Sequence, residues 1–161
     1  MKPTIQYKSF FSLSLWVLAL ILMGSLIGSL TQPEVKVWYS TLNRSNLTPP
    51  DAAFPIVWTI LYGMIGACGW VIWREAPSKI LRTLKGLYIT QLILNWSWTP
   101  IFFHYHMIGL SVGVIVAMNI VVGMLIYQAY PKVKAASLLL LPYFFWILFA
   151  SYLNSYIWWY N

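Results

Sequence analysis

Charged side chains are scarce in this sequence, and acidic ones are nearly absent. Of its 161 residues, 8% are charged, 60% are hydrophobic and 18% are aromatic. A soluble domain carries about 25% charged residues, so this chain has too few to cover its surface in water. Its three acidic residues, Glu34, Asp51 and Glu75, all lie between the long apolar runs. The composition predicts an integral membrane protein with no carboxylate inside the bilayer for a proton relay or a cation site.

The residue patterns of common catalytic and metal sites are also missing. A single cysteine, Cys68, excludes an internal disulfide and is expected to pack between helices. No Ser-His-Asp order, CxxC, HExxH or phosphate-binding glycine loop occurs, so hydrolase, redox and nucleotide-binding functions have no residues to carry them. His104 and His106 form an HxH pattern, which is a weak metal signal. Interfacial polar residues are the favoured explanation, and we expect no metal site.

Five apolar runs are each long enough to cross a membrane as a helix, which takes about 20 residues. The first is longer than the apolar part of a signal peptide and lacks a small-x-small cleavage site, so a retained span is expected. Five spans cannot form two equal inverted halves, which disfavours the usual secondary-transporter architecture. The sequence therefore predicts one all-α domain over 1–161, an integral membrane bundle of five helices. The expected spans are 10–30, 54–73, 84–103, 107–127 and 135–157.

The only long connection runs from Thr31 to Ala52. Its prolines, Pro33, Pro49 and Pro50, are expected to break any continuous helix, while 35–42 has the pattern of one or two amphipathic turns. Loops of this length in compact proteins are usually functional or disordered, and the aromatic pair Trp38-Tyr39 argues against disorder. We expect this partly helical loop to fold over one end of the bundle as a lid.

Basic residues are distributed unevenly among the connections. The formal charge of +7 would suit a nucleic-acid binder, but these charges lie between apolar runs and are better explained as orientation signals. Two basic residues, Lys36 and Arg44, lie on the side of the long loop. The other side has eight: Lys2, Lys8, Arg74, Lys79, Arg82, Lys85, Lys132 and Lys134. The count predicts a plasma-membrane protein with a cytoplasmic N-terminus, and with the C-terminus and the long loop outside.

The third span carries amide and aromatic side chains along one helical face. Gln91, Asn95, Trp98 and Phe102 are spaced at i, i+4, i+7 and i+11. A carboxamide in hydrocarbon is costly without a partner, so Asn95 should face protein or a ligand cavity rather than lipid. Two interpretations remain open for this face: polar contacts between helices, or the wall of a binding site.

Two further spans have comparable stripes. Phe54, Trp58, Tyr62 and Ile65 follow the proline-rich loop at helical spacing, which is typical of core packing but also of a ligand pocket. The last span repeats the pattern with Tyr143, Trp146, Ala150, Leu153 and Asn154. Together these stripes predict an aromatic cavity for a large, flat, mostly apolar ligand, with Asn and Trp N–H groups as orienting donors.

Small residues four apart occur in two of the spans. Gly24 and Gly28 form one such pair, and Gly109 and Gly113 form another. This spacing lets another helix approach closely. The partner could be a helix of the same bundle or of a second protomer, and the sequence does not decide between them.

The sequence resembles a known family, the TspO/translocator proteins, which are also called peripheral-type benzodiazepine receptors. Within that family it resembles a bacterial member. The resemblance is carried by WYSTLNRSNLTPP, AFPIVWTILYGMIGACGW, YITQLILNWSWTPIFF and LPYFFWILFASYLN. It implies a five-helix bundle, usually a homodimer, that binds porphyrins and, in animals, cholesterol and synthetic isoquinoline or benzodiazepine ligands. Bacterial members are reported to promote light-dependent breakdown of protoporphyrin.

The resemblance also implies a set of ligand-binding residues and two departures. Arg44-Ser45 replaces a basic-proline pair, which leaves the lid less rigid, and the C-terminal LNSYIWWYN lacks the basic residue of the animal sterol motif. The implied ligand-binding residues are Tyr39, Pro49, Pro50, Phe54, Trp58, Tyr62, Asn95, Trp98, Trp146, Ala150, Leu153 and Asn154.

Three functions fit these expectations. The chain could be a membrane receptor for porphyrins such as protoporphyrin IX or haem. It could degrade bound porphyrin under light, with Trp58 and Trp146 in the photochemical role of electron donors or radical sites, in which case the porphyrin is the substrate and no dedicated cofactor is needed. It could also carry tetrapyrroles or sterol-like lipids across the membrane. The expected partners are flat apolar small molecules, membrane lipid and a second copy of the chain, with no nucleic acid.

Overall fold

A computed structural model describes residues 4–161 and shows an all-helical chain. Two short turns connect longer helices: η1 (Tyr39–Thr41) is a 3-10 turn, and η2 (Pro100–His104) is a π-helical turn that continues the third helix. No strand occurs in the described part of the chain. The long helices are α1 (Thr4–Val37), α2 (Ala53–Arg74), α3 (Lys79–Thr99), α4 (Ile108–Ala129) and α5 (Lys134–Tyr160).

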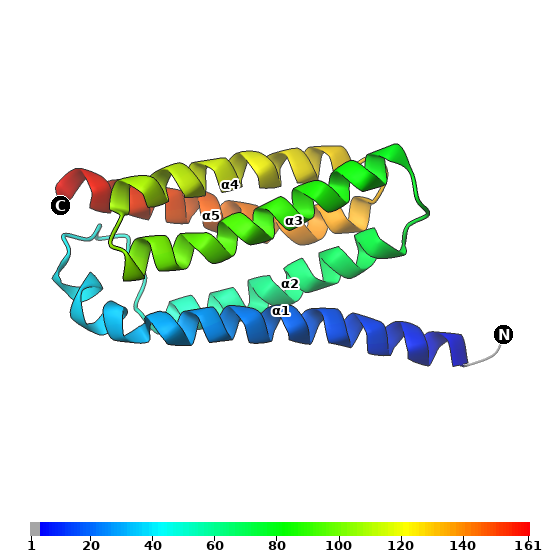
Figure 1. The fold of residues 1–161 in the computed structure, drawn as a ribbon, viewed down its shortest axis with the longest axis horizontal. Coiled ribbons are helices and arrows are strands. Elements are labelled where there is room, and N and C mark those ends of the chain that lie inside the picture. The colour runs from blue at the N-terminus through cyan, green and yellow to red at the C-terminus, as the bar shows by residue number, and fades with distance from the viewer. Residues whose placement is uncertain (1–3) are drawn as a thin grey trace.

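The five helices lie side by side and form one bundle (Figure 1). Around the bundle, α1 contacts α2, α2 contacts α5, α5 contacts α4, and α4 contacts α3, while the contact between α3 and α1 is slight. The α2–α3 and α4–α5 connections lie at the same end as the start of α1 (Figure 1). The long loop, the η2–α4 turn and the C-terminus lie at the opposite end. The bundle has the predicted five helices, and consecutive helices run in opposite directions.

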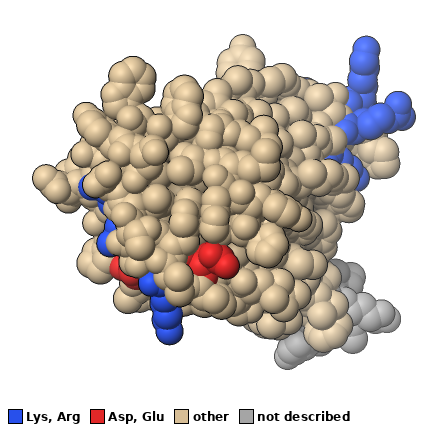
Figure 2. Space-filling model, turned by 60° about the vertical axis from the view of Figure 1, so that its left-hand side comes forward, with Lys and Arg blue, Asp and Glu red and all other residues tan. Residues whose placement is uncertain are grey.

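Four of these helices, α1, α2, α4 and α5, are long and apolar enough to cross a membrane. The expected third span, 84–103, corresponds to α3 and η2, which are less apolar because α3 carries three basic residues near its start and the amide face near its end. Together, α3 and η2 still run the length of the bundle beside the other helices (Figure 1). Figure 2 shows Lys and Arg side chains on opposite sides of the view, with a mostly uncharged surface between them. The chain is a multi-pass membrane protein.

The first helix extends further than expected. Pro33 was predicted to break it, and that prediction is wrong, because α1 continues through Pro33 to Val37. A proline removes only its own N–H, and membrane helices tolerate this where Ser or Thr side chains bond to nearby carbonyls. Thr31 makes a bond of this kind close to the proline, from its Oγ1 to the carbonyl oxygen of Gly28 at 2.9 Å, although the carbonyl that loses its N–H partner to Pro33 is that of Ser29. The long connection therefore covers 38–52, and η1 is its only helical turn among the described residues.

Close packing between α1 and α2 depends on glycines. A Cβ placed on Gly66 would lie 2.9 Å from the carbonyl oxygen of Trp16 and from the Cα of Val17, so only a glycine lets the two backbones approach this closely. Gly24 lies against the ring of Tyr62. This face of α1 therefore packs inside the bundle, whereas a Cβ on Gly28, one turn later, would meet no atom within 4 Å.

His106 connects the η2–α4 turn to the end of α1. It has a positive φ of 53°, and its Nε2 lies 3.2 Å from Oε2 of Glu34. Its ring also stacks on Trp38, with ring centroids 4.0 Å apart and an interplanar angle of 17°. Both contacts lie at the loop end of the bundle, as expected for an interfacial polar residue.

Candidate binding cavity

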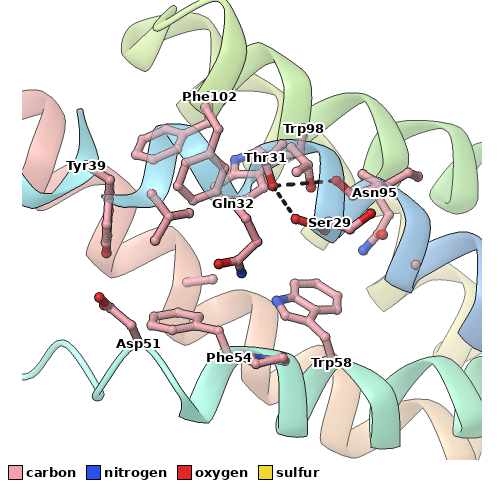
Figure 3. Close-up of a pocket in the computed structure, with 18 of the residues that line it drawn as sticks. Ser29, Thr31, Gln32, Tyr39, Asp51, Phe54, Trp58, Asn95, Trp98 and Phe102 are labelled. Atoms are coloured by element: carbon pink, nitrogen blue, oxygen red, sulfur yellow. Dashed lines mark hydrogen bonds between the residues drawn. The ribbon is translucent and has the colours of Figure 1, made fainter. Parts of the chain in front are cut away.

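A cavity of about 380 Å³ lies between the helices near the long loop. Figure 3 shows aromatic side chains from the loop, α2 and the end of α3 arranged around it. The structure brings together here ten of the twelve residues predicted to bind ligand: Tyr39, Phe54, Trp58, Tyr62, Asn95, Trp98, Trp146, Ala150, Leu153 and Asn154. The other two, Pro49 and Pro50, lie outside the cavity. They line a separate hollow formed by the loop itself.

The amide and aromatic face of α3 points into the bundle as predicted. Gln91, Asn95 and Phe102 are 0%, 3% and 2% exposed, respectively, and Trp98 is half-buried. The ring of Trp98 lies nearly parallel to that of Phe102, with centroids 5.2 Å apart and an angle of 8°. Gln91 lies outside the cavity lining, and neither its Oε1 nor its Nε2 has a hydrogen-bond partner among the described residues.

Asn95 combines the two interpretations that the sequence left open. Its Oδ1 accepts a hydrogen bond from the hydroxyl of Tyr62 on α2 at 2.5 Å, and its Nδ2 donates to the hydroxyl of Tyr143 on α5 at 3.0 Å. The hydroxyl of Tyr143 in turn donates to Sδ of Met118 on α4 at 3.2 Å. One carboxamide therefore links three helices directly and also lines the cavity.

A second amide, Asn154, lies deeper toward α4. Its Oδ1 accepts hydrogen bonds from Nε1 of Trp98 and from Oγ of Ser111, each at 3.0 Å. Asn154 is 2% exposed, yet its Nδ2 has no partner among the described residues, and neither does the buried Nε1 of Trp146. A buried N–H without an acceptor is costly. Both residues line the cavity, although these two nitrogen atoms are themselves enclosed by protein.

Trp58 and Trp146, the two residues predicted to take part in photochemistry, both line the cavity. Trp58 packs against Tyr62, with ring centroids 5.6 Å apart, and Trp146 packs edge-on against Phe54 at 6.0 Å. Both side chains are only partly buried. A planar ligand in the cavity would thus contact indole rings from α2 and from α5.

The wall contributed by α1 was missed by the sequence interpretation. Thr31 and Gln32 had been placed in the loop, although they belong to the helix, and Figure 3 shows both of them beside the cavity. A signal was present, because Ser25, Ser29 and Gln32 recur at i, i+4 and i+7. The cavity-lining residues of α1 are Gly24, Ser25, Ile27, Gly28, Ser29, Thr31, Gln32 and Val35.

The long loop is attached to the end of α5. The backbone N–H of Asn43 donates to Oδ1 of Asn161 at 2.9 Å, and Nδ2 of Asn43 donates to the carbonyl oxygen of Tyr160 at 3.1 Å. The hydroxyls of Ser45 and Tyr152 lie 2.9 Å apart. These contacts attach the loop to the C-terminal part of α5.

Two residues of the loop, Tyr39 and Asp51, line the cavity, and Tyr39 is 6% exposed. The guanidinium of Arg44 lies over its ring at 4.9 Å and also pairs with Asp51 at 3.2 Å. Burial raises the pKa of the Tyr39 phenol, and the Arg44 charge opposes part of that rise. The phenol therefore stays neutral at physiological pH and presents an uncharged hydrogen-bonding group.

Comparison with known proteins identifies the family. The chain is 37% identical to the tryptophan-rich protein TspO of Archaeoglobus fulgidus over 86% of its own length and 89% of that protein, and 38% identical to the tryptophan-rich protein TspO of Chlorobaculum tepidum over 91% and 94%. It is 30% identical to the human translocator protein over 84% and 82%. Residues 16–160 match the TspO/MBR family. The cavity lies within a multi-pass membrane protein. The chain therefore belongs to the TspO/MBR family.

Proposed function

We propose that this protein is a membrane receptor that binds a porphyrin or another flat tetrapyrrole in the cavity. The observation that supports this most directly is the convergence of indole and phenyl rings from α2, α5 and the end of α3 on one cavity. Ligand sites are mostly apolar pockets of roughly 300–1,000 Å³ with a few placed polar groups. Isoquinoline or benzodiazepine-type molecules have the same flat aromatic shape.

A receptor is favoured over a carrier by the position of the cavity. Its lining begins at Tyr62 on α2, at Asn95 on α3 and at Trp146 on α5, and extends from there only toward the loop end. Toward the basic end, the bundle is filled by buried side chains that include Ile65 and Tyr88. A carrier would need a path through this packed half.

Binding can be tested with a variant that fills the cavity. Ala150→Trp adds a large side chain to the cavity wall, so we expect the affinity for protoporphyrin IX to fall by at least about tenfold, or about 1.4 kcal/mol. Gly113→Ala is the matched control, because a Cβ there meets no atom within 4 Å and the residue does not line the cavity. Titration of both variants in nanodiscs measures the effect. Undetectable binding by the unmodified chain, or equal affinity in both variants, would contradict the proposal.

We also propose that the loop over 38–52 acts as a lid. Its attachment to α5 through Asn43 and Ser45 and the position of Tyr39 in the cavity wall support this. Saturating protoporphyrin should then protect the amides of 38–50 from hydrogen exchange, because the bound ligand contacts Tyr39 and holds the loop in place. Equal exchange with and without the ligand would rule out the lid.

The orientation in the plasma membrane is a further part of the proposal. The basic residues of the α2–α3 and α4–α5 connections lie at one end of the bundle, and the loop and the C-terminus lie at the other (Figure 1). By the positive-inside rule, a cysteine at Lys79 should react with a membrane-impermeant maleimide only from the cytoplasm, and one at Asn161 only from outside. Cys68 is buried and should stay unlabelled. The reverse labelling pattern would place the lid in the cytoplasm.

A further inference from the structure

The exposed part of the cavity wall is confined to one side of the bundle. Among all the residues that line the cavity, those from α3 and α5 are buried or half-buried, and so is Tyr39 of the loop. The lining residues that are also exposed at the surface come from α1, from the start of α2 and from the end of the loop that precedes it. They are Ser25, Ser29 and Gln32 on α1, Pro55 and Thr59 on α2, and Asp51 of the loop. The mouth of the cavity therefore lies between α1 and α2.

This mouth opens where the close packing of the two helices ends. Toward the basic end, α1 and α2 are in backbone contact at Gly66, and Gly24 lies against the ring of Tyr62. One turn further toward the loop, Gly28 has open space beside it. Figure 3 shows Gln32 extending from α1 toward Phe54 and Trp58 of α2.

The surface around the mouth is apolar. On α1, Leu26 and Leu30 are 55% and 72% exposed, and on α2, Ile56 and Ile60 are 63% and 59% exposed. These exposed aliphatic side chains are what a helix presents to lipid. The mouth consequently faces lipid hydrocarbon between α1 and α2, with the exposed Asp51 of the loop at one end of it.

The polar side chains in this lipid-facing mouth are unusual there. Hydroxyl and carboxamide groups exposed to hydrocarbon are costly unless they find a partner. Ser25, Ser29 and Gln32 share one face of α1. The Ser29 hydroxyl already donates to the carbonyl oxygen of Leu26 at 2.8 Å, so Ser25 and Gln32 are the residues that offer donors to a molecule lying between the helices. The mouth of the cavity is thus suited to hydrogen-bond acceptors, and aromatic rings line the cavity further inside.

We propose that the cavity is entered sideways from the bilayer between α1 and α2, past Ser29, and that Ser25 and Gln32 bind the acceptor-bearing edge of a membrane-dissolved amphiphile. The ligand class is a flat apolar molecule with carboxylate, ester or carbonyl groups at its edge. This inference rests on the proposed function, because it concerns the route into the same cavity and the contacts made at its mouth. The lid then stays attached to α5 during entry.

The route can be tested by blocking the mouth. Ser29→Trp places an indole between α1 and α2, and Leu22→Trp is the matched control, since Leu22 is 67% exposed on the same helix and does not line the cavity. Protoporphyrin is delivered from donor vesicles to protein in nanodiscs, and its emission is followed. We expect Ser29→Trp to slow both association and release by about tenfold relative to the control, because mutations that obstruct access change both rates together. Asn161→Ala, which removes a loop contact, should leave association unchanged.

The contacts at the mouth need a second measurement. Gln32→Leu removes one hydrogen bond and keeps the side-chain size, so the affinity for protoporphyrin should fall by about fivefold, while that for an all-alkyl porphyrin should stay unchanged. If Ser29→Trp matches Leu22→Trp in both rates, or if Asn161→Ala accelerates entry, the sideways route is wrong. If Gln32→Leu affects the two porphyrins equally, the edge contact is wrong. Absence of porphyrin binding by the unmodified chain would instead contradict the proposed function.

Discussion

Asn95→Leu should lower the free energy of unfolding by about 2 kcal/mol. Leucine has a similar size but leaves the hydroxyls of Tyr62 and Tyr143 without the carboxamide between them. An unsatisfied buried hydroxyl costs about 1–3 kcal/mol, although interhelical hydrogen bonds in membranes average about 0.6 kcal/mol. Tyr143 keeps Met118 as an acceptor, so most of the loss should come from Tyr62. Equilibrium unfolding in mixed micelles measures the change.

The matched control removes the partner rather than the amide. In a Tyr62→Phe background, Asn95→Leu should cost about 1 kcal/mol less than in the unmodified chain, because no hydroxyl on α2 is then left unpaired. An equal cost in both backgrounds would show that Asn95 stabilises the bundle through packing alone. A loss below about 0.5 kcal/mol, the scale of a surface substitution, would contradict the role of Asn95 as a link between helices.

Helical periodicity was enough to predict the cavity walls of α2, α3 and α5. Side chains on these helices point in directions fixed by 3.6 residues per turn, so Trp58, Asn95 and Trp146 could be assigned to inward faces before any packing was known. Nine of the twelve residues that the family resemblance implied for ligand binding fall on these same faces, and the other three, Tyr39, Pro49 and Pro50, lie in the loop. Their role in binding remains a prediction, whereas their convergence on one cavity is a property of the fold.

The wall formed by α1 could not be predicted in the same way. Pro33 signals a helix end in most sequences, but whether the helix continues depends on local hydroxyl groups and on neighbouring helices. The side of Gly24 that packs inward was also undetermined, because small-residue spacing is the same for a neighbour in the bundle and for a second protomer. Pro49 and Pro50 were placed in the cavity by analogy, and only the course of the loop puts them outside it.

If an indole takes part in the photochemistry, Trp146→Phe will separate binding from light-driven loss of porphyrin. Phenylalanine keeps most of the apolar area and the packing against Phe54, so the affinity should change by only about 1 kcal/mol. A phenyl ring is much harder to oxidise than an indole and cannot replace it as an electron donor or radical site. At saturating occupancy, the bleaching rate should therefore fall by at least about tenfold, equivalent to about 1.4 kcal/mol in the barrier.

Trp58 lines the same cavity and is a second indole that could donate, so the decisive variant combines Trp58→Phe with Trp146→Phe. Asn95→Leu supplies the contrast, because it removes a polar group and no redox-active ring; it should weaken binding more than it slows bleaching of the porphyrin that remains bound. Illumination rates at matched occupancy, compared with dark controls, distinguish these cases. An unchanged rate in the double variant would mean that the porphyrin bleaches by itself and that the protein only binds it, since neither cavity indole would then contribute to the reaction.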